Sequence, residues 1–121
     1  MKKVILVADD SPTIRKFVSF SLKMSGFEVL VACDGMEAAE LLPKRKVDLI
    51  ITDLNMPNLD GFELIKAIRE NEQNKDIPII ILSSLNRNED IERGLNYGAN
   101  SYLIKPFDPK RVQYEVSKYL N

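Results

Sequence analysis

Histidine is absent from the 121 residues of this sequence, and cysteine occurs only once, at Cys33. Without histidine the chain cannot form a Ser-His-Asp triad, a Cys-His dyad, a histidine-containing zinc site or a phosphohistidine of its own. A single cysteine cannot form a disulfide within the chain, and we expect Cys33 to be a small buried thiol. The chemistry of the chain must therefore use carboxylates, hydroxyls and lysines.

The sequence also lacks an excess of either charge and any long apolar run. Lys and Arg total 17 and Asp and Glu total 18, so no basic surplus is available to neutralise nucleic-acid phosphates. The first apolar stretch, residues 4–8, is too short for a signal-peptide core or a membrane span. We therefore expect a cytoplasmic protein that binds neither nucleic acid nor membrane.

Five short apolar runs rich in β-branched residues recur along the chain, at residues 4–8, 29–32, 49–52, 79–82 and 102–104. Because they are continuously apolar and do not alternate with polar residues, they predict parallel strands buried on both faces. With 45% hydrophobic and 29% charged residues, the chain has the composition of one globular domain, which we expect to occupy residues 1–121.

The segments between these runs carry helix signals. Helix starts are predicted where a polar residue precedes proline, glycine or an acidic residue, at 11–12, 34–35, 60–61, 88–89 and 108–109. Ile14, Phe17, Val18 and Leu22 fall on one face of the first helix. The alternation predicts a three-layer α/β/α, doubly wound (βα)5 fold with a five-stranded parallel sheet.

Polar side chains follow four of the five predicted strands. Asp9 and Asp10 end the first, Asp53 the third, Ser83 the fourth, and Lys105 follows the fifth. Because ligands bind at the carboxyl ends of such strands, we expect these side chains to form one site. Carboxylates there would repel by about 4 kcal/mol per pair at ~4 Å and an effective dielectric of about 20, so a cation is required. Mg²⁺ fits an all-oxygen set, and Lys105 supplies a second positive charge.

Asp53 is the expected nucleophile of this site. In a sheet of strand order 2-1-3-4-5 it stands at the end of the central strand, where it can attack phosphorus and form an aspartyl-phosphate. Asp9 and Asp10, adjacent on one turn, are better placed as metal ligands. The sequence therefore predicts a metal-assisted phosphoacceptor.

These residues resemble the receiver domain of two-component response regulators, and the single-domain CheY-like members in particular. The resemblance covers the whole chain and is carried by residues 9–10, 53–57, 60–61, 83 and 105–107. It implies a flavodoxin-like sheet with the strand order given above. It also implies that Asp53 is the phosphoacceptor, that Asp10 binds Mg²⁺ directly and Asp9 largely through water, and that the backbone carbonyl of Asn55 is a further ligand.

The resemblance further implies how the signal passes on. Lys105 would pair with the phosphoryl oxygens and precede a cis proline, Ser83 would be the switch hydroxyl, and Tyr102 the switch aromatic. The output face would comprise residues 89–97, Tyr102 and residues 110–119. The phosphodonor would be a sensor histidine kinase or a histidine phosphotransfer protein. With no effector domain expected on this chain, the target would be a separate protein.

Other interpretations exist for each feature. Taken alone, Asp53 is a turn residue, Ser83 a loop serine, Lys105 a solvated lysine and Tyr102 a core aromatic. A flavodoxin-like electron carrier shares the fold, but paired aspartates after the first strand would repel its phosphate. A haloacid-dehalogenase-type phosphatase needs a second aspartate where Asn55 stands, and a degenerate receiver would lack the intact acid pocket.

Overall fold

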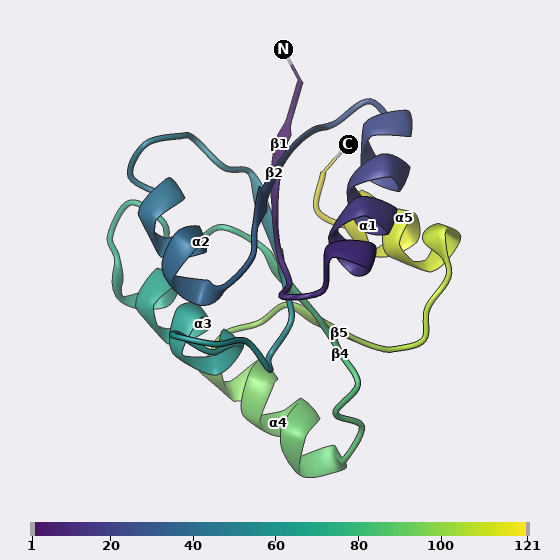
Figure 1. Ribbon diagram of the computed structural model, residues 1–121. Helices are drawn as coiled ribbons and strands as arrows, with labels where there is room; N and C mark the ends of the chain where they lie inside the picture. Colours follow the sequence, from purple (N-terminus) through teal and green to yellow (C-terminus); the bar gives the residue numbers. More distant parts are fainter. Residues whose placement is uncertain (1, 121) are drawn as a thin grey trace.

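The computed structural model describes residues 2–120, in which five strands alternate with five helices (Figure 1). The strands are β1 (Val4–Ala8), β2 (Glu28–Ala32), β3 (Leu49–Thr52), β4 (Ile79–Ser83) and β5 (Ser101–Ile104). The helices are α1 (Pro12–Met24), α2 (Gly35–Leu41), α3 (Gly61–Glu70), α4 (Asn88–Tyr97) and α5 (Pro109–Ser117). Each strand lies within one residue of its predicted bounds.

All neighbouring strands are parallel, in the order β2-β1-β3-β4-β5, which confirms the predicted fold class. The register brings the carboxyl ends of the strands level. Ala8 pairs with Ala32 on one side and Thr52 on the other, and Ser83 pairs with Ile104. The residues that follow these pairs therefore lie at one edge of the sheet, although they are far apart in the sequence.

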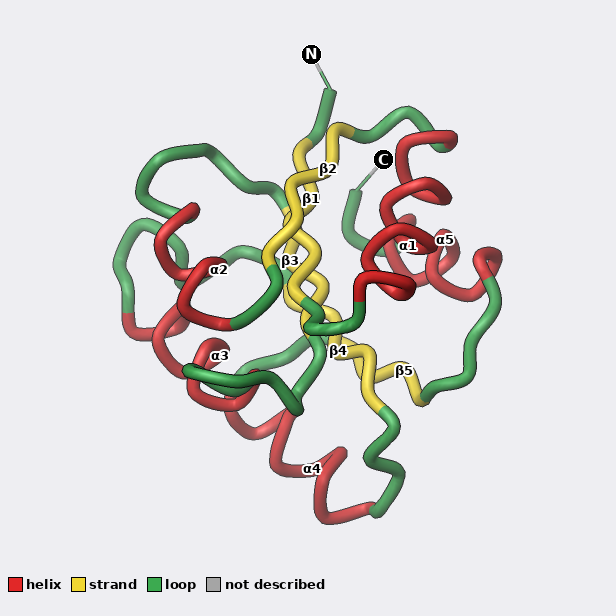
Figure 2. The backbone as a smooth tube through the Cα atoms, viewed as in Figure 1, coloured by secondary structure: helices red, strands yellow, loops and turns green. Residues whose placement is uncertain are grey.

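The sheet separates two layers of helices, with α2, α3 and α4 on one face and α1 and α5 on the other (Figures 1 and 2). Each face has its own core, because successive strand residues point to opposite sides. Leu6, Ile50 and Ile81 pack toward the first group of helices, while Val7 and Ile51 pack toward the second. Three central strands, β1, β3 and β4, are buried along their whole length, as predicted.

The prediction that all five strands are buried on both faces is wrong for the edge strands. Val31 of β2 is 46% exposed and Ile104 of β5 is 41% exposed. An edge strand has a neighbour on one side only, so the helices cover it incompletely. Cys33, which follows β2 along this edge, is exposed, and its expected burial is wrong for the same reason.

Four of the five helix starts follow the predicted capping signals, whereas α4 begins at the predicted Asn88 without a side-chain cap. Ser11 Oγ accepts a hydrogen bond from the N–H of Ile14 in α1, and Asp60 forms a capping box with Glu63 at the start of α3. The predicted apolar face of α1 is only partly buried, since Phe17 is 41% exposed and touches Phe107. No helix in the described residues is long and apolar enough to cross a bilayer.

Candidate functional site

Three carboxylates converge at the carboxyl edge of the sheet. Oxygen atoms of Asp9, Asp10 and Asp53 all lie within 4.8 Å of one another. Asp9 and Asp53 are buried, with 2% and 7% of their surface exposed, whereas Asp10 is exposed. The structure thus brings together the three aspartates that were placed at one edge of the sheet because they follow strand ends.

Lys105 bridges the two buried carboxylates. Its Nζ lies 3.0 Å from Asp9 Oδ2 and 3.1 Å from Asp53 Oδ2. The other oxygen of each carboxylate accepts a backbone hydrogen bond, Asp9 Oδ1 from Ser11 N–H at 2.9 Å and Asp53 Oδ1 from Leu54 N–H at 2.7 Å. Each buried carboxylate is therefore held by one backbone donor and one shared ammonium. The peptide bond after Lys105 is cis, as the resemblance implied.

Burial dominates the ionisation of Asp53. Desolvation raises the pKa of its carboxyl above the ordinary value and the charge of Asp9 adds to the rise, although Lys105 and the Leu54 N–H act in the opposite direction. The pKa of Lys105 is also raised, because its bonds and attraction to the two carboxylates outweigh the desolvation that lowers it. The single positive charge of Lys105 is therefore shared between two buried carboxylates.

The donor set fits a hard divalent cation. Three carboxylates face a single ammonium, which leaves a local surplus of negative charge that a divalent cation would offset. Mg²⁺ prefers carboxylate and carbonyl oxygens and retains several waters, which the exposed position of Asp10 allows. Asn55, two residues after Asp53, is exposed in the loop that follows β3.

Ser83 and Tyr102 both bond to the backbone of Leu85, in the loop that follows β4. Ser83, fully buried at the end of β4, accepts a hydrogen bond from the Leu85 N–H to its Oγ at 3.1 Å. The Tyr102 hydroxyl donates to the Leu85 carbonyl at 2.7 Å. Burial raises the pKa of Tyr102. Both side chains are therefore hydrogen-bonded to the backbone of the loop between β4 and α4. Sequence spacing does not reveal this link.

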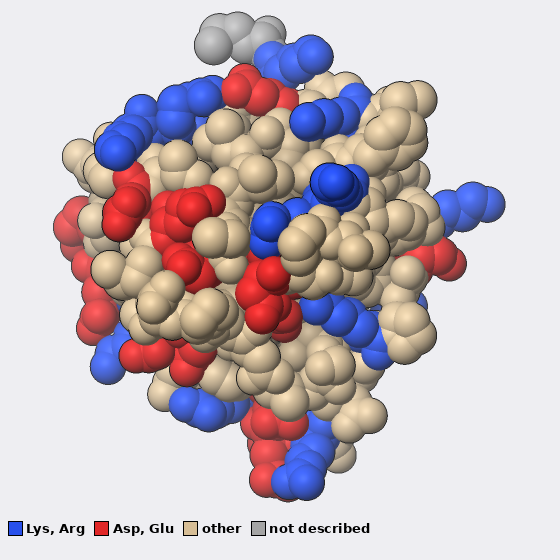
Figure 3. Space-filling view, viewed as in Figure 1, with Lys and Arg blue, Asp and Glu red and all other residues tan. Residues whose placement is uncertain are grey.

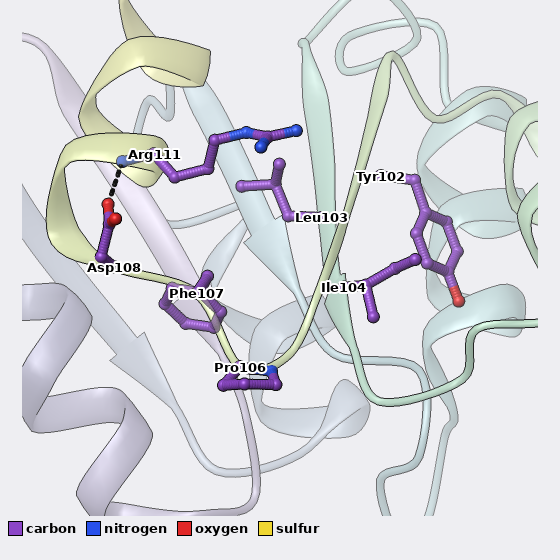
Figure 4. A pocket seen from close by; sticks show the side chains of 7 residues that line it. All are labelled: Tyr102, Leu103, Ile104, Pro106, Phe107, Asp108 and Arg111. Atoms are coloured by element: carbon purple, nitrogen blue, oxygen red, sulfur yellow. Dashed lines mark hydrogen bonds between the residues drawn. The ribbon is translucent and has the colours of Figure 1, made fainter.

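Tyr102 also borders an open groove along β5 and the start of α5. The groove has a volume of about 490 Å³, and its lining is drawn in Figure 4. Tyr102 and Leu103 point to opposite sides of β5 in this view, while the Asp108 carboxylate caps α5 through the Arg111 N–H at 2.8 Å. Exposed apolar side chains also lie on α4, β5 and α5, namely Leu95, Tyr97, Ile104 and Tyr114.

Two further residues contact the acid cluster without being expected to do so. Gly61 begins α3 against the carbonyl oxygen of Asp53, where a Cβ would overlap that oxygen and approach Leu54 Cα to 2.7 Å. Arg15 of α1 donates from Nη1 to the backbone carbonyl of Asp9 at 2.7 Å. Neither contact has a signature in sequence spacing, because each depends on how a helix packs against the sheet edge.

Charge on the rest of the surface is uneven although the net charge is only -1. Acidic side chains gather over the α2 and α3 side of the molecule, with basic side chains around them (Figure 3). The near-zero net charge therefore conceals local acidic areas on the surface.

The fold and the acid cluster define a class of signalling protein. The sequence profile of the response regulator receiver domain matches residues 5–117. The chain belongs to this family: it is a CheY-like receiver domain of the two-component response regulators. The electron-carrier and phosphatase alternatives are therefore not favoured.

Two of the curated relatives are transcriptional regulators that are longer than this chain. The chain is 38% identical over 116 residues to the DNA-binding dual master transcriptional regulator RpaA of Synechocystis, and 38% identical over 120 residues to the alkaline phosphatase synthesis regulator PhoP of Bacillus subtilis. The matches cover 96% and 99% of this chain but 48% and 49% of those proteins, so the chain spans about half their length.

Solved structures match over nearly the whole chain. Chemotaxis protein CheY4 of Vibrio cholerae has a TM-score of 0.94 at 38% identity, with 99% of this chain and 100% of that chain covered. The receiver domain of sensor histidine kinase PA1611 of Pseudomonas aeruginosa, described with a magnesium ion coordinated in its active-site cleft, has a TM-score of 0.90 at 29% identity, with 98% of each chain covered.

Proposed function

We propose that this receiver domain accepts a phosphoryl group on Asp53 in a Mg²⁺-dependent reaction. The observation that carries the proposal is the position of the Asp53 carboxylate, buried at the end of the central strand and flanked by the Lys105 ammonium and two further aspartates. Asp9, Asp10, Asp53 and the backbone carbonyl of Asn55 are the residues that would hold the metal.

The transfer follows from the charges at this edge. A bound Mg²⁺ supplies positive charge that stabilises the negative charge developing on the phosphoryl oxygens. An oxygen of Asp53 forms the new bond to phosphorus as the bond from phosphorus to the imidazole nitrogen of a partner's phosphohistidine breaks. The electron pair of the broken bond stays on that nitrogen, which takes a proton from water. The Lys105 ammonium, which already touches Asp53, pairs with a phosphoryl oxygen.

Phosphorylation then changes the contacts of the neighbouring loop. The new phosphoryl oxygens are strong acceptors, so the Ser83 hydroxyl turns to donate to them and releases the Leu85 N–H. Because the Tyr102 hydroxyl is bonded to the carbonyl of the same Leu85, that movement frees the aromatic ring to rotate inward. The surface formed by α4, β5 and α5 shifts between two states and carries the output.

Receiver domains act with histidine kinases and effectors. We assign the donor role to a sensor histidine kinase or a histidine phosphotransfer protein, which supplies the histidine that this chain lacks. The output partner is an effector protein that reads the α4, β5 and α5 surface. The only reactions assigned to the chain itself are its phosphorylation and the slow hydrolysis of its own aspartyl-phosphate. A cytoplasmic location stays a prediction.

Metal titration and phosphorylation from acetyl phosphate test this assignment. Asp10→Ala should weaken Mg²⁺ binding, because it removes one of three carboxylates. Asp34→Asn, which changes a carboxylate that caps α2 and is not one of these three, should leave the affinity unchanged. An unchanged affinity in Asp10→Ala would contradict the ligand assignment. Capture of proteins with and without beryllofluoride would identify the effector.

A further inference from the structure

Arg15 approaches the acid cluster from α1 and has no part in the chemistry described above. Its Nη1 donates to the backbone carbonyl of Asp9 at 2.7 Å, and the side chain is half-buried. That carbonyl belongs to the peptide group that joins Asp9 to Asp10. The guanidinium therefore holds the orientation of the one peptide that connects the two expected metal ligands.

The two aspartates depend on this peptide to different degrees. Asp9 is anchored by its own backbone N–H, which donates to the Ala32 carbonyl at 3.1 Å, and by both carboxylate oxygens, which bond to Ser11 and Lys105. Asp10 is exposed, and its carboxylate is brought near Asp53 by the backbone that precedes it. Loss of the Arg15 contact would thus affect the direction of Asp10 more than that of Asp9.

We propose that Arg15 is a positioning residue for the divalent cation: by fixing the peptide between Asp9 and Asp10, it holds the Asp10 carboxylate toward Asp53. This inference rests on the proposed function, because it concerns the ligands assigned there. Partners that orient a metal ligand without touching the metal change its affinity about 10-fold to 100-fold when they are removed.

The sign of the effect separates positioning from charge. Arg15 carries a positive charge near a cation site, so if charge alone mattered, its removal would tighten Mg²⁺ binding. If Arg15 orients Asp10, its removal weakens binding. Lys16, the next residue, is exposed and carries the same charge, so Lys16→Met is the matched control for the loss of a charge on α1.

Mg²⁺ dependence of phosphorylation by acetyl phosphate gives the first readout. Arg15→Met should raise the half-saturating Mg²⁺ concentration about tenfold and leave the rate at saturating Mg²⁺ within about twofold of wild type. Arg15→Lys, which keeps one donor for the Asp9 carbonyl, should recover part of the affinity. Lys16→Met should leave the half-saturating concentration unchanged. General damage to the fold would instead lower the amplitude without shifting the concentration dependence.

Amide hydrogen exchange in EDTA gives a second readout that needs neither metal nor phosphoryl transfer. Arg15→Met should accelerate exchange at Ser11, whose N–H donates to the Asp9 carboxylate within this turn, and leave that of Ile50 in the central strand unchanged. An unaltered half-saturating Mg²⁺ concentration, tighter binding, or unaltered exchange at Ser11 would overturn the role of Arg15. Absence of Mg²⁺-dependent phosphorylation in the wild type would instead contradict the proposed function, and the exchange measurement would still decide on Arg15.

Discussion

Replacement of Lys105 by methionine tests the electrostatic balance of the site. In the wild type, one ammonium lies within 3.0 and 3.1 Å of two buried carboxylates, and only 19% of the lysine side chain is exposed. Methionine keeps much of the apolar stem but removes the charge. At neutral pH and without metal, Asp9 and Asp53 would face each other unneutralised.

The structure sets the expected decrease in the free energy of unfolding of Lys105→Met. Two carboxylate charges separated by 4.8 Å, the limit of the cluster, repel by about 3.5 kcal/mol at an effective dielectric of about 20. Removal of one partner from a buried ion pair costs roughly 3–5 kcal/mol. Because the edge of the cluster is open at Asp10, screening places the expected loss for Lys105→Met at the lower end, about 3 kcal/mol.

Urea unfolding in EDTA measures the decrease in the free energy of unfolding in Lys105→Met. Conditions that reverse the decrease identify its cause. Acidification should reduce it, because protonation of Asp53, whose pKa is already raised by burial, removes the repulsion. Asp53→Asn in the same background should restore most of the stability, since the amide oxygen can still accept from the Leu54 N–H. A loss below about 0.5 kcal/mol, or a loss that neither acid nor Asp53→Asn changes, would refute the electrostatic explanation.

Three further outcomes follow from single residues around the site. Because the raised pKa of Asp53 lets the folded state hold its proton longer than the unfolded state does, the contribution of Asp53 to the free energy of unfolding should fall as pH rises from the ordinary aspartate pKa to the raised one. Asp53→Asn should remove that slope and raise the free energy of unfolding at neutral pH, measured by denaturant titrations across pH in EDTA; an unchanged slope would contradict the pKa direction. Gly61→Ala should cost about 2 kcal/mol and slow phosphorylation, because its Cβ would overlap the Asp53 carbonyl; normal rate and thermal stability would show that α3 yields without disturbing Asp53. Asp60→Ala should cost about 1 kcal/mol through loss of the capping box, with phosphorylation unaffected, and a slowed reaction would show that the cap does more than begin the helix.

The sequence predicts the fold well where the signal is local. Continuous apolar runs locate the strands, and capping residues such as Ser11 and Asp60 locate the helix starts, because both depend on residues only a few positions apart. The same runs do not say which strands lie at the edges. Val31 and Cys33 were therefore expected inside and are exposed, since exposure depends on how far the neighbouring helices reach.

The site was predictable to the extent that topology alone assembles it. The rule that strand ends meet at one edge brings Asp9, Asp53 and Lys105 together without any knowledge of packing. The sequence does not predict the hydrogen bonds from Arg15 to the Asp9 carbonyl and from Tyr102 to the Leu85 carbonyl. Each bond joins a side chain of one element to a backbone carbonyl of another. Every residue has a backbone carbonyl, so the residue type does not show which one is bonded.

Location of the phosphoryl group after reaction with acetyl phosphate tests the central claim most directly. The protein is incubated with Mg²⁺ or with EDTA, the aspartyl-phosphate is trapped by borohydride reduction, and the modified residue is identified by peptide mass spectrometry. We expect one acid-labile phosphoryl group per chain, on Asp53, formed only with Mg²⁺ and absent from Asp53→Asn. Equal labelling in EDTA, a modified residue other than Asp53, or normal labelling of Asp53→Asn would contradict the account.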